Sequence, residues 1–189
     1  MSPHASTARD YLQRGIAHYE QDELEQAHQA LSAAIAADPH LAAAYLWRAL
    51  TLEELGRFKE AMNDYDRAIA LEPRSAEAHY DRGNVRAALG QIEGAIEDYR
   101  RCLQLDPQYA PAYHNLGTLY ERRGQFRQAL EAYDRAIALD PDYALAYANR
   151  AEARAALGDR QGAAEDRRRA LALDPSLGGD EPFPSNGGA

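Results

Sequence analysis

Residues 110–143 read APAYHNLGTLYERRGQFRQALEAYDRAIALDPDY, and related stretches of the same length precede and follow them in this chain of 189 residues. Near its end each copy carries an acidic residue followed by a proline, and the five prolines lie 34 residues apart: Pro39, Pro73, Pro107, Pro141 and Pro175. So regular a spacing indicates one supersecondary unit repeated end to end, in which each copy contacts only its neighbours. We therefore expect a long binding surface rather than a closed catalytic pocket.

Small residues recur at fixed places within these repeats. The five repeats, numbered internally from position 1 to position 34, span residues 8–41, 42–75, 76–109, 110–143 and 144–177. Position 20 is alanine in every repeat, and position 27 is alanine except in the third repeat, where it is Cys102. Because protein interiors are tightly packed, a small side chain at the same place in every copy indicates that two helices approach closely there. Cys102 is accordingly expected to be a core residue rather than a nucleophile.

Each repeat is predicted to form two helices. Apolar residues at helical spacing indicate a first helix over roughly positions 1–14 and a second that runs to about position 30. The first helix is expected to end at a glycine, which readily adopts the left-handed conformation that caps a helix: Gly56, Gly90, Gly124 and Gly158. The second is expected to stop before the Asp-Pro or Glu-Pro step, since proline restricts its predecessor and donates no backbone hydrogen bond. The fold class is therefore all-α.

The fourth repeat carries the fullest set of these signals: Tyr113, Leu116, Gly117, Tyr120, Ala129, Tyr133 and Pro141. This pattern resembles the tetratricopeptide repeat, and the resemblance extends over residues 8–177. It implies a right-handed superhelical solenoid of five tandem helix-turn-helix units, whose first helices line a concave groove. It also implies that peptides or protein partners bind in this groove. Members of this family are, in addition, seldom enzymes in their own right.

The two ends of the chain differ from the repeats. Residues 1–7 and the Gly- and Pro-rich residues 178–189 are expected to be disordered, because they contain too few large apolar side chains to form a core. In the last repeat, polar or small residues replace the apolar ones on the second helix: Arg160, Ala164 and Arg167. A terminal repeat needs such a polar outer face where it meets water, so we expect the array to end there.

The charge balance limits the classes of partner. Lys and Arg number 21 against 30 Asp and Glu, which gives a net charge of −9, so nucleic acid and anionic lipid are disfavoured. No stretch approaches the about 18 apolar residues of a membrane-spanning helix, and the start of the chain lacks the apolar segment of a signal peptide. With a single cysteine, no intrachain disulfide forms. We expect a cytoplasmic protein that uses neither a membrane nor nucleic acid as its partner.

Positions 7 and 23 vary together within the chain. Three repeats combine arginine at position 7 with aspartate at position 23: Arg48 with Asp64, Arg82 with Asp98, and Arg150 with Asp166. The fourth repeat replaces both, with Leu116 and Ala132, whereas the first breaks the rule with Arg14 and Ala30. One explanation is a partly buried ion pair between the two helices of a repeat. The other is shared ancestry of the repeats.

After the packing positions are assigned, positions 2, 5, 6, 9, 12 and 13 of the first helices remain for the groove. In the first three repeats several of them are large and apolar: Leu12, Ile16, Leu46, Trp47, Leu50 and Tyr80. A contiguous apolar patch is a recognised sign of an interaction site, and Trp and Tyr are favoured anchors. The alternative is that Trp47 packs against neighbouring helices or covers the start of the array.

Further along, the predicted groove becomes polar, with candidate partner-binding residues Asp81, Asn84, His114, Asn115 and Asn149. Asparagine recurs at position 6 in Asn115 and Asn149, and its amide both donates to and accepts from an extended peptide backbone. The resemblance implies such an asparagine ladder, and a solvated helix face is the alternative. The cations with which some members of the family grip acidic C-terminal tails are missing here, so binding of chaperone tails is disfavoured.

No chemistry beyond binding is indicated. The six histidines show no metal-ligand spacing, and no arrangement of nucleophile, base and acid is present, so we predict no metal, no cofactor and no enzymatic activity. The leading hypothesis is an adaptor that binds a protein or an extended peptide in the groove. The alternatives are a scaffold that self-assembles or acts as a spacer in a multiprotein complex, and autoinhibition by the tail around Phe183.

Overall fold

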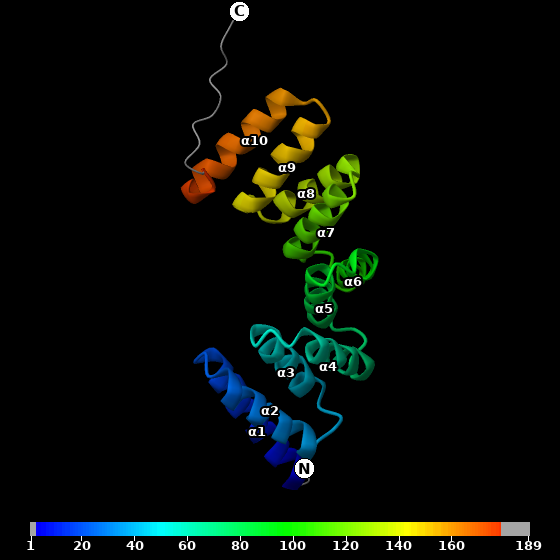
Figure 1. Cartoon of the computed structure of the whole chain (residues 1–189), viewed down its shortest axis with the longest axis vertical. Coiled ribbons are helices and arrows are strands. Elements are labelled where there is room, and N and C mark those ends of the chain that lie inside the picture. Colours follow the sequence, from blue (N-terminus) through cyan, green and yellow to red (C-terminus); the bar gives the residue numbers. More distant parts are fainter. Residues whose placement is uncertain (1–2, 179–189) are drawn as a thin grey trace, which may run out of the picture. The chain divides into compact units, whose positions relative to one another are not determined.

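The structure is a computed structural model that describes the backbone of residues 3–178 and the side chains of residues 7–178. These residues form ten α-helices and one short 3₁₀-helix, without a strand (Figure 1). The helices are α1 (Pro3–Glu20), α2 (Leu24–Ala37), α3 (Ala42–Glu54), α4 (Phe58–Leu71), α5 (Ala76–Ala88), α6 (Ile92–Leu105), α7 (Ala110–Arg122), α8 (Phe126–Leu139), α9 (Ala144–Ala156), α10 (Arg160–Leu173) and η1 (Pro175–Leu177). The prediction of an all-α array of helix pairs is confirmed.

The chain divides into two compact blocks, residues 1–107 and residues 108–189. The N-terminal block holds the first three repeats, α1 to α6, and the C-terminal block holds the last two, α7 to α10. Within each block every helix packs against the next one along the chain. The first helices of neighbouring repeats also touch, α1 with α3 and α3 with α5 in one block, and α7 with α9 in the other. Each block thus contains a face made only of first helices, which we call its first-helix face.

The helix ends follow the local signals in the sequence. Four glycines after the first helices have φ between 70° and 87°, which is the left-handed region that favours glycine: Gly56, Gly90, Gly124 and Gly158. In the first repeat Asp22 takes this place with φ 59°. The last residue of each second helix directly precedes the acidic residue of the acidic-proline step, as Leu105 precedes Asp106.

The expectation for the start of the chain is corrected. Residues 1–7 were expected to be disordered, but α1 begins at Pro3, so residues 3–7 are helical. Proline is well tolerated in the first turn of a helix, where its missing N–H would have no partner within the helix. Ala8 is fully buried, so this extension leads directly into the packed part of the repeat. The tail predicted to be disordered lies, from residue 179 on, outside the described residues.

Small residues and tyrosines build the core. Ala27, Ala61, Ala95 and Ala129 at position 20 are fully buried, as is Cys102 at position 27. Tyrosines at position 24 fill the space between the paired helices: Tyr65, Tyr99 and Tyr133. A Cβ added to Gly117 would lie 2.5 Å from a ring carbon of Tyr133, so this pair of helices meets at a distance that only glycine permits without a shift of the ring.

Candidate functional site

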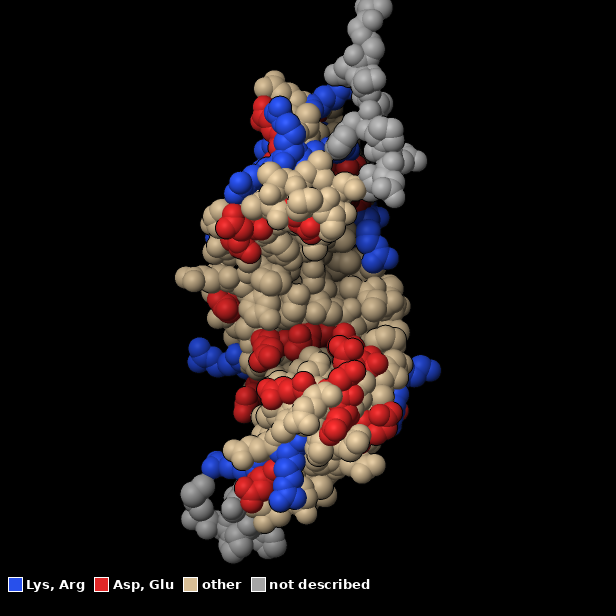
Figure 2. Space-filling view, turned by 90° about the vertical axis from the view of Figure 1, so that its left-hand side faces the viewer, with Lys and Arg blue, Asp and Glu red and all other residues tan. Residues whose placement is uncertain are grey.

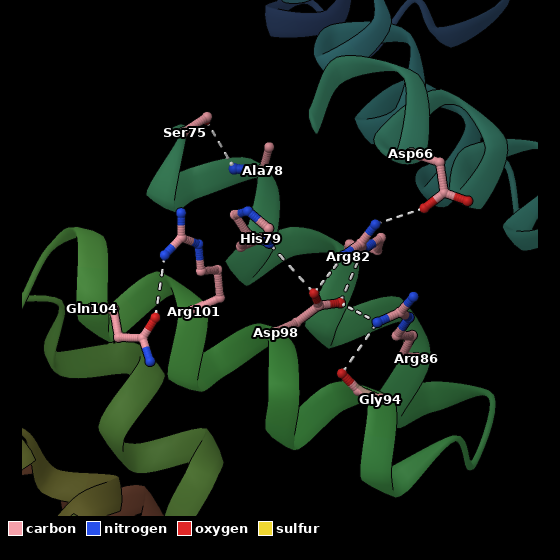
Figure 3. A network of polar contacts seen from close by, with 10 residues as sticks. All are labelled: Asp66, Ser75, Ala78, His79, Arg82, Arg86, Gly94, Asp98, Arg101 and Gln104. Carbon is pink, nitrogen blue, oxygen red and sulfur yellow. Dashed lines mark hydrogen bonds and ion pairs between the residues drawn. The ribbon is translucent and has the colours of Figure 1, made fainter. Parts of the chain in front are cut away.

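The predicted ion pairs between positions 7 and 23 are present in all three repeats. Arg82 donates to both carboxylate oxygens of Asp98, with N–O distances of 3.0 and 2.6 Å (Figure 3). Arg48 does the same to Asp64 at 2.7 and 2.8 Å. Arg150 and Asp166 repeat the arrangement at 2.8 and 2.7 Å, and the aspartates are buried throughout. These two-pronged bonds join the two helices of each repeat with the geometry that guanidinium and carboxylate prefer.

Each of these arginines also reaches the preceding repeat, a contact that was not predicted from the sequence. The remaining terminal nitrogen of Arg82 donates to Asp66 at 2.7 Å, and that of Arg150 donates to Asp134 at 2.6 Å. Arg48 donates in the same way to the hydroxyl of Ser32 at 3.1 Å. All three acceptors stand at position 25, and this shared register is the signal that identifies them in the sequence. One arginine therefore links the second helices of two successive repeats.

Asp98 has further donors. Arg86 approaches its Oδ2 at 2.9 Å and donates to the carbonyl of Gly94 at 3.3 Å, while His79 Nδ1 lies 3.4 Å from Oδ1 (Figure 3). Asp166 receives the equivalent contact from Arg154 at 3.1 Å. Carboxylates between the paired helices are thus compensated by arginines, as buried charges generally must be.

The apolar candidates of the N-terminal block lie on its first-helix face and are half-buried: Leu12, Ile16, Leu46, Trp47, Leu50 and Tyr80. Trp47 on α3 meets Tyr19 on α1 edge to face, with ring centroids 5.5 Å apart. Leu46 and Leu50 pack against the core formed by residues such as Leu52 and Tyr65. Each of these side chains therefore packs on one side and keeps some surface exposed.

Carboxylates border this apolar strip. The face contains Glu20, Glu53, Glu54, Glu77 and Asp81, and Figure 2 shows acidic side chains gathered over the N-terminal block. Burial, followed by the charges of Glu77 and Glu53, raises the pKa of Asp81 to about 7. Burial, followed by Glu54, Glu53 and Asp81, raises the pKa of Tyr19 above its ordinary value. Side chains from α1, α3 and α5 therefore share one negative electrostatic field.

Tyrosine hydroxyls from the second helices reach these faces. Tyr65 donates to Glu53 at 3.0 Å, and Tyr133 donates to Glu121 at 2.8 Å in the corresponding place of the other block. Tyr99 donates to the carbonyl oxygen of Asn84 at 2.8 Å, which fixes the orientation of that amide. The sequence signal was the pairing of tyrosine at position 24 with glutamate at position 12, which two repeats share.

The first-helix face of the C-terminal block brings together three predicted residues: His114, Asn115 and Asn149. Asn149 donates to His114 Nε2 at 2.9 Å, so His114 Nδ1 carries the proton and donates to Asn115 at 3.1 Å. His114 was expected to face an open groove, yet it is buried, because the rings of Tyr133 and Tyr143 lie 5.8 and 4.9 Å from it. Burial lowers its pKa, and the hydrogen bond with Asn115 opposes this effect.

The described part of the chain offers neither a metal-binding cluster nor a membrane-spanning helix. Among its residues no group of three or more His, Cys, Asp or Glu side chains is arranged to hold a metal ion. None of the helices in residues 3–178 combines the length and apolar content needed to cross a bilayer.

Models of known protein families match the repeats of this chain. Profiles described as TPR repeat match residues 54–90 and 83–124, and profiles described as tetratricopeptide repeat match residues 12–70 and 110–143. A search of curated proteins found no match.

Solved structures show the same fold. The crystal structure of MamA protein is 26% identical, with a TM-score of 0.80 over 90% of this chain and 93% of that one. A MamA structure from Desulfovibrio magneticus RS-1 is 23% identical, with a TM-score of 0.81 over 95% and 99%. YrrB, described as a TPR protein with an unusual peptide-binding site, is 23% identical, with a TM-score of 0.74 over 87% and 85%.

Proposed function

Because the chain belongs to the tetratricopeptide-repeat family, we propose that it is a protein-interaction scaffold whose N-terminal block binds an extended peptide along its first-helix face. Tetratricopeptide repeats are typically interaction modules without catalytic activity of their own, and no cofactor is part of the proposal. A cytoplasmic location remains a prediction from the sequence.

The contact between Tyr19 and Trp47 carries this proposal. It joins two half-buried aromatic rings from neighbouring first helices, so a continuous apolar strip crosses from α1 to α3. Large aromatic side chains with part of their surface exposed are favoured anchors for a partner. Leu12, Ile16 and Leu50 extend the strip.

Polar groups beside the strip suit a peptide backbone. Asn84 accepts a hydrogen bond from Tyr99 through its carbonyl oxygen, which fixes the orientation of an amide that can both donate to and accept from a peptide backbone. Asp81 stands on the same helix, one turn before it. In the C-terminal block, Asn115 and Asn149 are already bonded to His114, so a peptide there would have to compete with these bonds.

The test is selection of peptides from a random library by the immobilised chain, followed by fluorescence anisotropy on the selected sequences. We expect Trp47→Ala to weaken binding at least about tenfold, since a buried aromatic anchor contributes ≥ ~2 kcal/mol. Lys59→Ala on α4 is the matched control, because Lys59 is exposed and lies on a second helix. Far-UV circular dichroism checks that Trp47→Ala folds, and Asn84→Ala provides a milder second variant. Equal binding by wild type and both variants contradicts the site.

A self-assembling scaffold is the second candidate. Four leucines with 37 to 47% of their surface exposed favour it: Leu89, Leu139, Leu145 and Leu157. Concentration-dependent light scattering distinguishes the two functions, because a chain that stays monomeric over the working range does not assemble through these leucines.

A further inference from the structure

The charges on the first-helix face of the N-terminal block are strongly unbalanced. Its positions hold five carboxylates and one guanidinium, that of Arg9. Within the described residues, no ion pair or side-chain hydrogen bond involves four of the five carboxylates: Glu20, Glu54, Glu77 and Asp81. Carboxylates between the paired helices, by contrast, are compensated by arginines, as Asp98 is by Arg82 and Arg86. Of these two surfaces, the first-helix face carries uncompensated negative charge, and the surface between the paired helices does not.

The C-terminal block provides an internal comparison. Its first-helix face holds two carboxylates, and both have partners within the block. Glu121 accepts a hydrogen bond from Tyr133 at 2.8 Å, and Glu152 pairs with Arg167 at 2.7 Å. An uncompensated negative field is thus a property of the N-terminal block and not of the repeat as such.

The uncompensated carboxylates lie beside the apolar strip. The side chain of Asp81 on α5 feels the charge of Glu53 on α3, and both affect Tyr19, whose ring contacts Trp47. A ligand on this face therefore meets large apolar side chains and carboxylates together. Aromatic rings also attract guanidinium and ammonium groups, which favours the same kind of ligand.

From this juxtaposition we infer that the N-terminal block selects extended peptide segments in which Arg or Lys stands next to large apolar side chains. The inference rests on the proposed function and specifies its partner. The basic side chains would supply the cations that Glu54, Glu77 and Asp81 lack among the described residues, and the apolar side chains would pack on Trp47 and Leu50. An acidic or neutral segment would leave the carboxylates uncompensated, so electrostatic complementarity provides the selectivity.

Proton release adds a distinctive signature. The charges that act on Asp81 are those of Glu77 on its own helix and Glu53 on α3. Asp81 in turn raises the pKa values of the groups that face it from the other helices: Tyr19 of α1, Tyr65 of α4 and Cys102 of α6. With its pKa at about 7, Asp81 is partly protonated at neutral pH, and a bound cation favours its charged form. Binding therefore releases a proton, and affinity for a basic peptide rises by up to about tenfold between pH 6 and pH 8.

The experiment uses a display library of random nonapeptides, selected in parallel on the wild-type chain and on Glu54→Gln/Glu77→Gln/Asp81→Asn. We expect the wild type to enrich Arg and Lys at least about threefold over the library and the triple variant to lose that enrichment. Glu97→Gln, which removes an exposed carboxylate from α6, is the matched control and should behave as wild type. Selected peptides are then measured by anisotropy at pH 6 and pH 8 and at two salt concentrations.

The outcomes separate this inference from the proposed function. Selected peptides that are neutral or acidic, yet weakened by Trp47→Ala, contradict the charge selection and leave the peptide site intact. Basic peptides that bind equally well to Trp47→Ala contradict the site on α3, because only diffuse attraction then remains. Failure of the wild type to select any peptide contradicts both. A pH dependence that survives in Asp81→Asn shows that another group releases the proton.

Discussion

Arg82 and Asp98 form a two-pronged ion pair across the two helices of the third repeat, and the same arginine continues to Asp66 of the second repeat. One guanidinium therefore satisfies a buried carboxylate and links successive repeats at once. Because Asp98 is 2% exposed, water cannot replace a missing donor.

We predict that Arg82→Leu destabilises the N-terminal block by about 3 kcal/mol, since it leaves the buried charge of Asp98 with Arg86 and His79 as its remaining partners. Arg82→Leu combined with Asp98→Ala should recover at least half of this loss. The fourth repeat has such an uncharged pair naturally, with Leu116 and Ala132 at the same two positions. Urea unfolding followed by the fluorescence of Trp47 measures both. If the single and double variants are equally stable, the pair contributes nothing beyond its packing.

Gly117→Ala is expected to destabilise the C-terminal block by about 1–3 kcal/mol, because the added methyl group would lie 2.5 Å from the ring of Tyr133. Ala49 occupies the same position in the second repeat, where it packs in one core with Tyr65, so Ala49→Gly is the reciprocal variant. Thermal unfolding of both variants decides the question. An unchanged melting temperature for Gly117→Ala would mean that the ring of Tyr133 shifts at little cost.

Asp81→Asn should stabilise the N-terminal block at pH 8 by on the order of 1–3 kcal/mol, because it removes an uncompensated, half-buried charge. The folded protein holds the proton of Asp81 up to about pH 7, whereas the unfolded chain releases it near pH 3.8. Stability therefore falls as pH rises across this interval, and the advantage of the variant shrinks towards its lower end. Urea unfolding at pH 5.5 and pH 8, with Glu97→Gln as the control, tests the sign.

The C-terminal block should show the opposite dependence. Burial lowers the pKa of His114, so the unfolded chain takes up a proton near pH 6.5 while the folded block does not. Acidification below pH 6.5 therefore destabilises this block, by at most about 1.4 kcal/mol per pH unit. Amide exchange of α7 and α9 at pH 5 and pH 7.5 reports the loss, and His114→Gln should reduce its pH dependence. A wild-type block whose exchange rates, corrected for intrinsic chemistry, do not change would contradict the buried neutral histidine.

Most of the fold could be predicted from the sequence because its signals are local and repeated. The acidic-proline steps and the glycines with positive φ mark helix ends by backbone geometry alone. Even the pairing of Arg82 with Asp98 was visible, since the fourth repeat replaces both partners together.

The candidate site was less predictable, because its properties depend on which side chains meet across helices. Position 5 can be assigned to the first-helix face, but the burial of His114 follows from the rings of Tyr133 on α8 and Tyr143, the residue before α9. The reach of Tyr99 to Asn84 and of Arg82 to Asp66 likewise depends on helix spacing. The helical structure of residues 3–7, which precede the first repeat, was not predicted, because no repeated pattern marks it.

Cys102 gives the chain a built-in reporter of local opening. Its thiol is fully buried, and burial, followed by the charges of Asp106 and Asp81, raises its pKa to about 12. An alkylating reagent therefore reacts with this sole cysteine only after the third repeat has come apart, since the reactive species is the thiolate. The rate of alkylation of the unmodified protein thus measures how often the N-terminal block opens, and a ligand that holds α5 in place would slow it in proportion to its occupancy.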